Sequence, residues 1–304
     1  MLPHLEENYI SVVIVTRNDE AVCAQAISGI SDFLAGTFKN YEILVVDNCS
    51  SDRTIEILRD TPGAFTVVEF PRTYPQQAAL TAGVDLAVGD YIVEIPDLNV
   101  PFPPEAILKL YHECQKGHDF VFYTPASIPP MSRLFYMLIN RQFHNRLPLS
   151  IASSVMTMSS RRGQNRVTSL QNRQVNRTVS YAMSGLKSSR IDFNSAYRNK
   201  RGLGENIFLL LDTFIYHTEF LQKILTIITT LFFLFCIGCI GYGGYSYIFR
   251  PYVSGWLSSF IFMTVAFSGV FLVFLVIARQ LNNLMRDAIQ TRPYTFTSVT
   301  KKER

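Results

Sequence analysis

The chain has 304 residues, 48% of them hydrophobic, and its mean hydropathy of +0.15 is high for a protein that is wholly soluble in water. Residues 1–160 contain 10 Lys or Arg and 18 Asp or Glu, whereas residues 161–304 contain 18 basic and 6 acidic residues, so the net charge of +4 hides an asymmetry. The five cysteines are scattered along the chain, which excludes a disulfide framework.

The first 125 residues alternate apolar runs with helical patterns. Strands are expected at 11–16, 41–47, 65–70, 91–95 and 119–124, with a helix in each interval. Single helices between strands predict right-handed crossovers, and therefore a mostly parallel, doubly wound α/β sheet. Ligands of such sheets bind at the carboxyl ends of the strands, where Asp47, Asp97 and residues 16–19 are placed. A dinucleotide-binding fold is excluded because no glycine-rich turn follows the first strand.

Residues 126–220 have a different character. Apolar residues repeat on one side of the segment 132–147 and arginines lie beyond them, a pattern that predicts a basic amphipathic helix in a membrane interface. A second such helix is expected at 205–222. The alternative, that both are ordinary core helices, stays open.

Two apolar segments follow, at 224–249 and 251–278, and neither contains a charged residue. Each exceeds the roughly 20 residues that cross a hydrocarbon core, so they predict a transmembrane hairpin. A buried hairpin in a soluble core is disfavoured because neither segment has a polar face. Basic residues flank both ends of the pair, and the positive-inside rule therefore places residues 1–220 and both termini in the cytoplasm.

Five motifs occur in order along the chain: SVVIVTRNDE (11–20), YEILVVDNCSSDRT (41–54), TYPQQAALTAGVDLAVGDYIV (73–93), DLNVPFPPE (97–105) and YRNKRGLGEN (197–206). Together with the apolar hairpin, they resemble the family 2 glycosyltransferases with the GT-A fold. The likeness is greatest to the polyprenyl-phosphate type, such as dolichyl-phosphate mannose synthase and the bacterial enzymes that glucosylate undecaprenyl phosphate. It covers nearly the whole chain.

This resemblance implies a GT-A, Rossmann-like core at 1–125 that binds a nucleotide sugar, an acceptor-binding region at 126–220, a membrane hairpin at 221–279 and a cytoplasmic basic tail at 280–304. The expected activity is that of an inverting hexosyltransferase in a bacterial inner membrane. It would move a sugar from a nucleotide diphosphate donor, expected to be UDP-linked, to a polyprenyl phosphate. The family also forms oligomers through its hairpins, and we expect a homo-oligomer here.

The resemblance further implies a donor site. Asp47, at a strand end, can accept hydrogen bonds from the N–H groups of a base. Asp97 is the expected catalytic residue and metal ligand for Mg²⁺ or Mn²⁺, because Mg²⁺ is held by one or two carboxylates together with substrate phosphates. The expected nucleotide-binding residues are Thr16, Asp19, Asp47, Gln77 and Asp97.

The chain departs from its family next to Asp97. Many members have a D-x-D pair, but the first position here is Ile95, and Asn99 replaces the usual Gln. Glu94 lies on the opposite face of the strand and is not expected to substitute for the missing carboxylate. Asp52 is expected to brace the turn before the next helix rather than contact a ligand.

A long stretch without acidic residues bears on which group accepts the sugar. No Asp or Glu occurs between residues 120 and 191, although attack by a sugar hydroxyl calls for a general base. A phosphate monoester, whose second pKa is about 6, is already ionised and needs none. It needs cations, which the family's Arg-rich segment supplies as Arg198 and Arg201, with Arg133 as a further candidate. Arg198 and Arg201 are therefore expected to be catalytic residues together with Asp97. The other basic residues of 161–201 are expected to face anionic lipid head groups.

Two alternatives of function stay open. The same fold could transfer to a hydroxyl of another lipid-linked saccharide, or the chain could be a catalytically silent relative that binds and scaffolds, which the residue Ile95 favours. Nucleic acid is not an expected partner, because the basic stretch lacks the aromatic spacing of a base-stacking surface.

Overall fold

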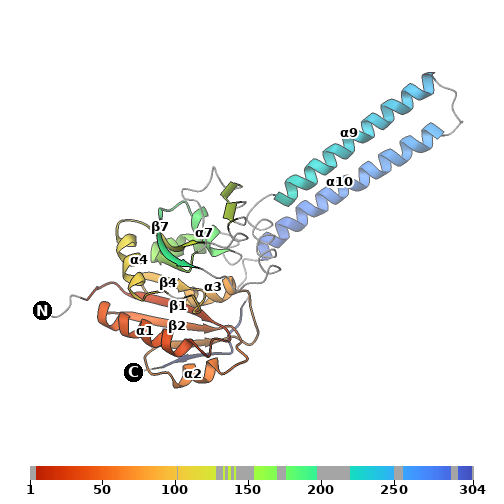
Figure 1. Ribbon diagram of the computed structural model, residues 1–304. Coiled ribbons are helices and arrows are strands. Elements are labelled where there is room, and N and C mark those ends of the chain that lie inside the picture. The colour runs from red at the N-terminus through yellow and green to blue at the C-terminus, as the bar shows by residue number, and fades with distance from the viewer. Residues whose placement is uncertain are drawn as a thin grey trace. The chain divides into compact units, whose positions relative to one another are not determined.

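The computed structural model describes residues 5–100, 102–127, 154–169, 176–196, 220–249, 256–288 and 294–302, with 133, 136, 137, 140 and 141. The chain divides into two compact units, one formed by residues 1–210 with 291–304 and the other by residues 211–290. The first unit is an α/β domain and the second a pair of helices (Figure 1).

Eight strands form one mixed sheet in the described part of the first unit, in the order β7-β5-β6-β4-β1-β2-β3-β8. Strands β1 to β4 pair in parallel, β6 runs antiparallel between β4 and β5, β7 pairs in parallel with β5, and β8 pairs antiparallel with β3. The strands are β1 (Ile10–Thr16), β2 (Tyr41–Asp47), β3 (Thr66–Glu69), β4 (Tyr91–Ile95), β5 (Phe120–Ser127), β6 (Met156–Ser160), β7 (Ser188–Ala196) and β8 (Ser298–Lys301).

Helices cover both faces of the sheet because the side chains of each buried strand alternate between two hydrophobic cores. Val12 and Ile14 of β1 join the core beneath α1 (Cys23–Thr37), α2 (Thr54–Asp60) and α4 (Glu105–Gln115). Val13 and Val15 join the core beneath α3 (Gln76–Leu86). A Cβ at Gly83 would lie 2.3 Å from Val13 Cγ1, so this glycine allows α3 to pack closely on β1.

The predicted mostly parallel α/β sheet is confirmed, and the first five strands and four helices fall where the apolar runs place them. Three strands were not expected. β6 and β7 come from residues after 125, and β8 comes from the segment 280–304, which was expected to be a cytoplasmic tail. These strands are short or rich in Ser and Thr, so their apolar pattern is weak.

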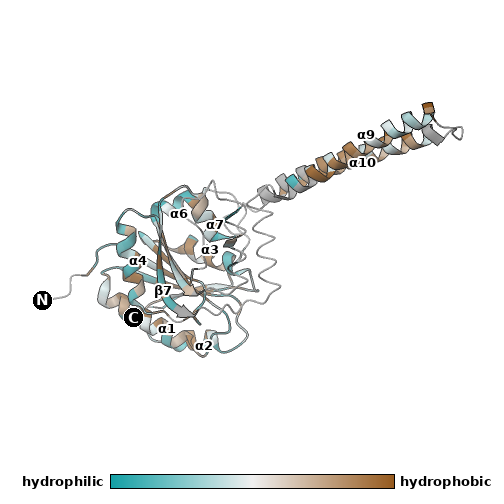
Figure 2. Cartoon of the chain, turned by 45° about the horizontal axis from the view of Figure 1, so that its top comes forward, coloured by the Kyte–Doolittle hydropathy of each residue, from teal (hydrophilic) through white to brown (hydrophobic). Residues whose placement is uncertain are grey.

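The second unit contains α9 (Phe220–Phe249) and α10 (Trp256–Ala288). They pack antiparallel, with Phe232 against Phe271 at 4.2 Å between ring centroids and Cys236 Sγ 3.3 Å from Ser268 Oγ. The stretches Thr226–Phe249 and Ser259–Ala278 are long and apolar enough to cross a membrane, and their large apolar side chains are mostly exposed. Figure 2 shows much of this pair in the hydrophobic colour. The two-helix hairpin expected from the sequence is therefore present.

Several predicted features lie outside the described residues: Arg198, Arg201 and residues 205–219 of the helix expected at 205–222, whose last three residues begin α9. Of the helix expected at 132–147, only residues 133, 136, 137, 140 and 141 are described, and all five are helical.

Candidate functional site

The carboxyl ends of β4, β1 and β2 meet at one edge of the sheet, because the three strands are parallel neighbours in register. Thr16 pairs with Asp47, and Ile14 pairs with Ile95. The residues that follow each strand end therefore gather at this edge, which we call the donor edge. It contains Thr16, Asp19, Asp47, Asp97 and Asn99.

Asp47 ends β2 and is only 2% exposed. Its Oδ1 accepts a hydrogen bond from Ser50 Oγ at 2.5 Å and its Oδ2 accepts one from Ser50 N at 3.0 Å. The turn between them depends on Cys49, whose φ of 59° is left-handed. Burial raises the pKa of the Asp47 carboxyl above its ordinary value, and the hydrogen bonds from Ser50 offset this only in part. Each oxygen still has a lone pair with which to accept from a ligand.

A hydrogen-bonded chain joins Asp19 to Asp97. Asp19 Oδ2 accepts from Thr16 Oγ1 and from Arg17 N, both at 3.0 Å. Its Oδ1 accepts from Asn99 Nδ2 at 2.5 Å, and the same Nδ2 lies 3.1 Å from Asp97 Oδ1. The carboxylates after β1 and β4 are thus linked by one amide group. Three of the expected donor residues, Thr16, Asp19 and Asp97, belong to this chain of contacts.

Asn99 is a site residue that was not expected from the sequence, where it stands out only as a departure from the family. Its backbone N–H also donates to Asp97 Oδ1 at 2.8 Å. This is the contact of an Asx turn, in which an Asp side chain accepts from the backbone N–H two residues later. The spacing of Asp97 and Asn99 was the available signal.

Asp97 is the natural place for a cation at the donor edge. Its Oδ1 accepts both hydrogen bonds from Asn99, while its Oδ2 accepts none from any residue that the structure describes. Ile95 is fully buried in the core beneath α1 and α4, so no ligand can come from that position. The described residues contain no group of three or more His, Cys, Asp or Glu side chains that could hold a metal. The donor set therefore fits a hard cation that completes its coordination with phosphates and water.

Two glutamines begin α3, and the first of them holds the backbone next to Asp97. Gln76 Nε2 donates to the carbonyl of Pro96 at 2.5 Å, immediately before Asp97. Gln77 was expected to bind nucleotide, but its Oε1 accepts from the backbone N–H of Arg177 at 3.0 Å. The nucleotide contact of Gln77 remains a prediction.

Asp52 has the structural role expected of it: its Oδ1 accepts from Thr54 N at 3.0 Å, at the start of α2.

The expectation that the basic residues of 161–201 face lipid is wrong for Arg177, and two others have contacts within the first unit. Arg161 donates to the carbonyls of Ala87 and Gly89. Arg162 pairs with Asp119 at 2.6 Å, and Arg177 is buried. Ordinary structural contacts therefore account for part of the positive charge in this half of the chain. Arg133 is exposed, and its predicted phosphate contact remains a prediction.

Arg177, in α7 (Arg177–Met183), is 2% exposed and forms a forked ion pair with Glu94 of β4. The distances are 2.8 Å from Nε to Oε2 and 2.9 Å from Nη2 to Oε1. The same carboxylate also accepts from Tyr181 OH and from Gln164 Nε2 of α6 (Arg161–Thr168). Arg177 Nη1 donates to Thr81 Oγ1 of α3 at 3.0 Å. Burial alone would lower the pKa of the guanidinium, but the charges and hydrogen bonds of Glu94 and Tyr181 together outweigh burial and raise it. Glu94 therefore has a structural partner, consistent with its expected position on the face opposite Ile95.

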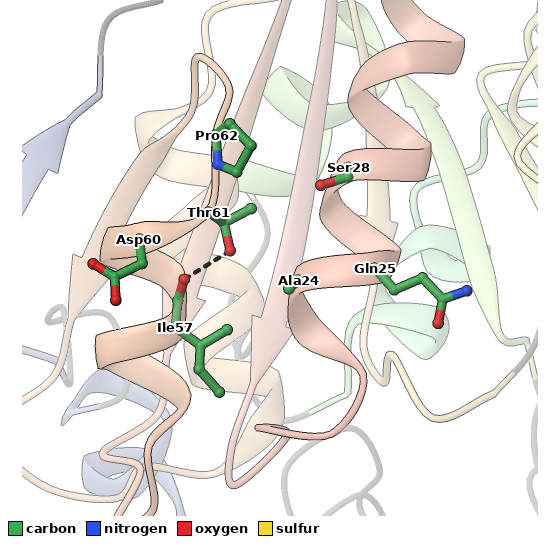
Figure 3. A pocket seen from close by; sticks show the side chains of 7 residues that line it. All are labelled: Ala24, Gln25, Ser28, Ile57, Asp60, Thr61 and Pro62. Atoms are coloured by element: carbon green, nitrogen blue, oxygen red, sulfur yellow. Dashed lines mark hydrogen bonds between the residues drawn. The ribbon is translucent and has the colours of Figure 1, made fainter.

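A hollow of about 470 Å³ lies between α1 and α2, lined by Ala24, Gln25, Ser28, Ile57, Asp60, Thr61 and Pro62 (Figure 3). None of the donor-edge residues lines it. Thr61 Oγ1 donates to the carbonyl of Ile57 at 2.7 Å, which closes the end of α2 rather than leaving a free polar group. This hollow is not the candidate site.

The model of the glycosyl transferase family 2 matches residues 11–188, which include the whole donor edge. The chain belongs to glycosyl transferase family 2. Family membership confirms the resemblance stated above and the expected enzyme class, since this is a family of glycosyltransferases.

Curated relatives match a smaller part of the chain. An uncharacterized glycosyltransferase, YkcC of Bacillus subtilis, is 35% identical over 115 residues, which are 37% of this chain and 35% of the relative. An undecaprenyl-phosphate 4-deoxy-4-formamido-L-arabinose transferase of Aeromonas hydrophila is 32% identical over 116 residues, again 37% and 35% of the two chains. The chain thus spans about a third of the length of these relatives.

Solved structures of the same fold extend further along the chain. Glucosyl-3-phosphoglycerate synthase from Mycobacterium tuberculosis, in complex with Mn²⁺, UDP and phosphoglyceric acid, superposes with a TM-score of 0.55. The match covers 68% of this chain and 76% of that one at 19% identity. At this identity the likeness concerns the fold, and it confirms the expected GT-A architecture.

Proposed function

We propose that this chain is a membrane-anchored glycosyltransferase that moves a sugar from a nucleotide diphosphate donor to a polyprenyl phosphate. One observation carries the proposal: at the donor edge, the Asp97 carboxylate keeps one oxygen without a partner among the described residues, next to a fixed network that includes Asp19. The undecaprenyl-phosphate transferases among the relatives support this choice of acceptor.

In this proposal the donor's base contacts Asp47, which can accept from base N–H groups once it is ionised. The diphosphate lies toward Asp97. A divalent cation, Mg²⁺ or Mn²⁺, held by Asp97 would neutralise the charge of the departing diphosphate. The Mn²⁺ and UDP in the similar solved structure support a metal and a uridine donor.

The acceptor phosphate would supply the nucleophile without a general base. One of its charged oxygens forms a bond to the anomeric carbon of the sugar as the bond from that carbon to the diphosphate oxygen breaks. The nucleoside diphosphate leaves with the bonding electrons, and attack from the opposite side inverts the configuration. Arg198 and Arg201, with Arg133, are the residues that we propose hold the lipid phosphate, because guanidinium groups make forked contacts with phosphate.

The course of the chain supports an anchor with two crossings. Residues 1–210 precede α9, and β8 follows α10, yet both belong to one sheet-containing unit. Both ends of the helical pair must therefore be on the same side of a membrane, which two crossings satisfy. We propose that this is the cytoplasmic side of a bacterial inner membrane, since Lys and Arg flank the pair.

The test is a radiolabelled transfer assay with the full chain in membranes, a panel of nucleotide sugars and a polyprenyl phosphate. We expect a lipid-phosphate product that mild acid cleaves. Product formed only on the hydroxyl of a lipid-linked saccharide would replace the proposed acceptor. Donor binding without turnover on either acceptor would make the chain a silent relative.

A matched variant examines the role of Asp97. Asp97→Ala should abolish transfer while the protein stays folded and membrane-bound, because no second carboxylate at position 95 can hold the cation. Asp60→Ala is the control, since this acidic side chain is exposed at the C-terminal end of α2, away from the donor edge. Full activity of Asp97→Ala would contradict the metal assignment.

A further inference from the structure

The segment Tyr294–Lys302 follows the second apolar helix in the chain and packs onto the first unit; we call it the C-terminal clasp. Its strand β8 pairs antiparallel with β3, with Val68 opposite Val299. Two more backbone hydrogen bonds extend this pairing, from Thr297 N to the carbonyl of Glu69 and from Lys302 N to that of Phe65, both at 2.8 Å. The clasp is thus an integral edge of the sheet.

Side chains fasten both ends of the clasp. Tyr294 is 6% exposed, stacks on Phe70 with 6.3 Å between centroids, and donates its hydroxyl to Asp85 Oδ2 of α3 at 2.5 Å. Phe296 stacks on the same Phe70 at 5.9 Å. At the other end, Lys302 Nζ donates to the carbonyls of Arg59 at 2.6 Å and Thr61 at 2.5 Å, where an ammonium stabilises the C-terminal end of α2.

The clasp reaches the donor edge through Tyr74. Thr295 N donates to Tyr74 OH at 3.3 Å, and the Thr295 and Tyr74 hydroxyls lie 3.2 Å apart. The backbone of Tyr74 is held in turn by the side chain of Asn48, with Nδ2 donating to its carbonyl and Oδ1 accepting from its N–H, both at 2.8 Å. Asn48 directly follows Asp47 and donates its own N–H to the carbonyl of Thr16. Two contacts therefore separate the clasp from the residue that we propose binds the base.

We propose that the clasp is part of the donor site and that Tyr74 is a positioning residue for nucleoside diphosphate binding, an inference that rests on the proposed donor. The segment between β3 and α3 carries Phe70 and Tyr74, and the clasp supplies partners to both. Without the clasp, the Tyr74 hydroxyl loses its two contacts with Thr295, and Asn48 is then anchored to a loop with fewer contacts. The turn that follows Asp47 then loses part of its support. Residues beyond the membrane hairpin thereby control affinity at the opposite end of the chain.

The experiment compares Tyr74→Phe with the full wild-type chain in detergent micelles. This variant removes only the hydroxyl that meets Thr295. Tyr91→Phe is the control, since the Tyr91 hydroxyl has no hydrogen-bond partner within the described ranges. UDP and GDP are the probes in a titration with Mn²⁺, and amide hydrogen exchange is followed at Asn48 and Phe70, whose N–H groups donate to Thr16 and Asp47.

We expect the dissociation constant of the bound nucleotide to rise about three- to tenfold in Tyr74→Phe, the loss typical of one hydrogen bond, and exchange at Asn48 and Phe70 to accelerate. Tyr91→Phe should change neither. Unchanged exchange in Tyr74→Phe would overturn the proposal, and so would faster exchange with unchanged affinity. If the wild type binds neither nucleotide, the proposed donor fails, and the exchange rates alone decide whether the clasp supports the donor edge.

Discussion

The buried ion pair between Glu94 and Arg177 permits a quantitative prediction. Glu94→Gln keeps the shape of the side chain but removes its charge, which leaves a guanidinium that is 2% exposed without its counter-ion. Removing one partner of a buried pair costs about 3–5 kcal/mol. The carboxylate accepts four hydrogen bonds here, from Arg177 Nε and Nη2, Gln164 and Tyr181, and two of them come from the cation itself. The cost should therefore lie within that range.

For a domain of this size the loss corresponds to a fall in the thermal midpoint of roughly 6–20 °C. The double variant Glu94→Gln, Arg177→Met removes both charges and should be less destabilised than Glu94→Gln alone. Arg53→Met is the control, because the Arg53–Glu56 pair is largely exposed and its loss should hardly change the midpoint. The assay is thermal unfolding of the full chain in micelles, followed by near-ultraviolet circular dichroism.

A midpoint for Glu94→Gln within the error of the wild type would refute this reasoning. It would mean that water or lipid head groups reach Arg177, as its position in a basic stretch predicts. A double variant less stable than either single variant would also contradict it, because the two charges would then stabilise the fold independently.

Three further predictions concern packing and the donor edge. Gly89→Ala should lower the free energy of unfolding by about 1–3 kcal/mol, because the added Cβ would lie 2.7 Å from Ser11 N. Gly29→Ala in α1 is the contrasting variant: its Cβ meets nothing within 4 Å, so it should stabilise the helix. Denaturant unfolding measures both changes. Because the Asp47 carboxylate must be ionised to accept from the base, nucleotide affinity should fall as the pH drops through its raised pKa. Ser50→Ala removes a hydrogen bond that lowers this pKa, so it should move the loss of affinity to higher pH. An unmoved profile would show that Asp47 does not bind the base. Asn99→Ala should weaken Mn²⁺-dependent UDP binding about tenfold in a calorimetric titration, since it frees both Asp19 and Asp97, and unchanged affinity would exclude a role for this link.

The parts of the fold that the sequence predicts are those built from local patterns. The buried parallel strands β1, β2 and β4 are short and rich in Val and Ile, and Thr16, Asp47 and Asp97 lie at or just past their ends. Such runs predict both the strand and the edge at which it ends. The donor edge was therefore accessible from the sequence.

The features that escaped prediction depend on contacts between distant residues. Glu94 and Arg177 are 83 positions apart, and Tyr74 and Thr295 are 221 apart, so no local period links them. A basic residue in a basic stretch has no sequence signal that separates a buried cation from a lipid-facing one. Asn99 differs, because its contact with Asp97 spans only two positions and a turn pattern could have revealed it.

The carboxylates near the donor edge differ in what remains available for a ligand. Glu94 is neutralised by a buried arginine on the α3 side of β4, and Asp19 uses both oxygens for Thr16, Arg17 and Asn99. Only Asp97 among these three ends with an oxygen that no described residue engages. A strand alternates its side chains between two faces, so β4 directs Glu94 into the core network while Asp97 lies past the strand end, where it is half-buried. The same short stretch thus supplies one carboxylate to stability and leaves the other available for a ligand.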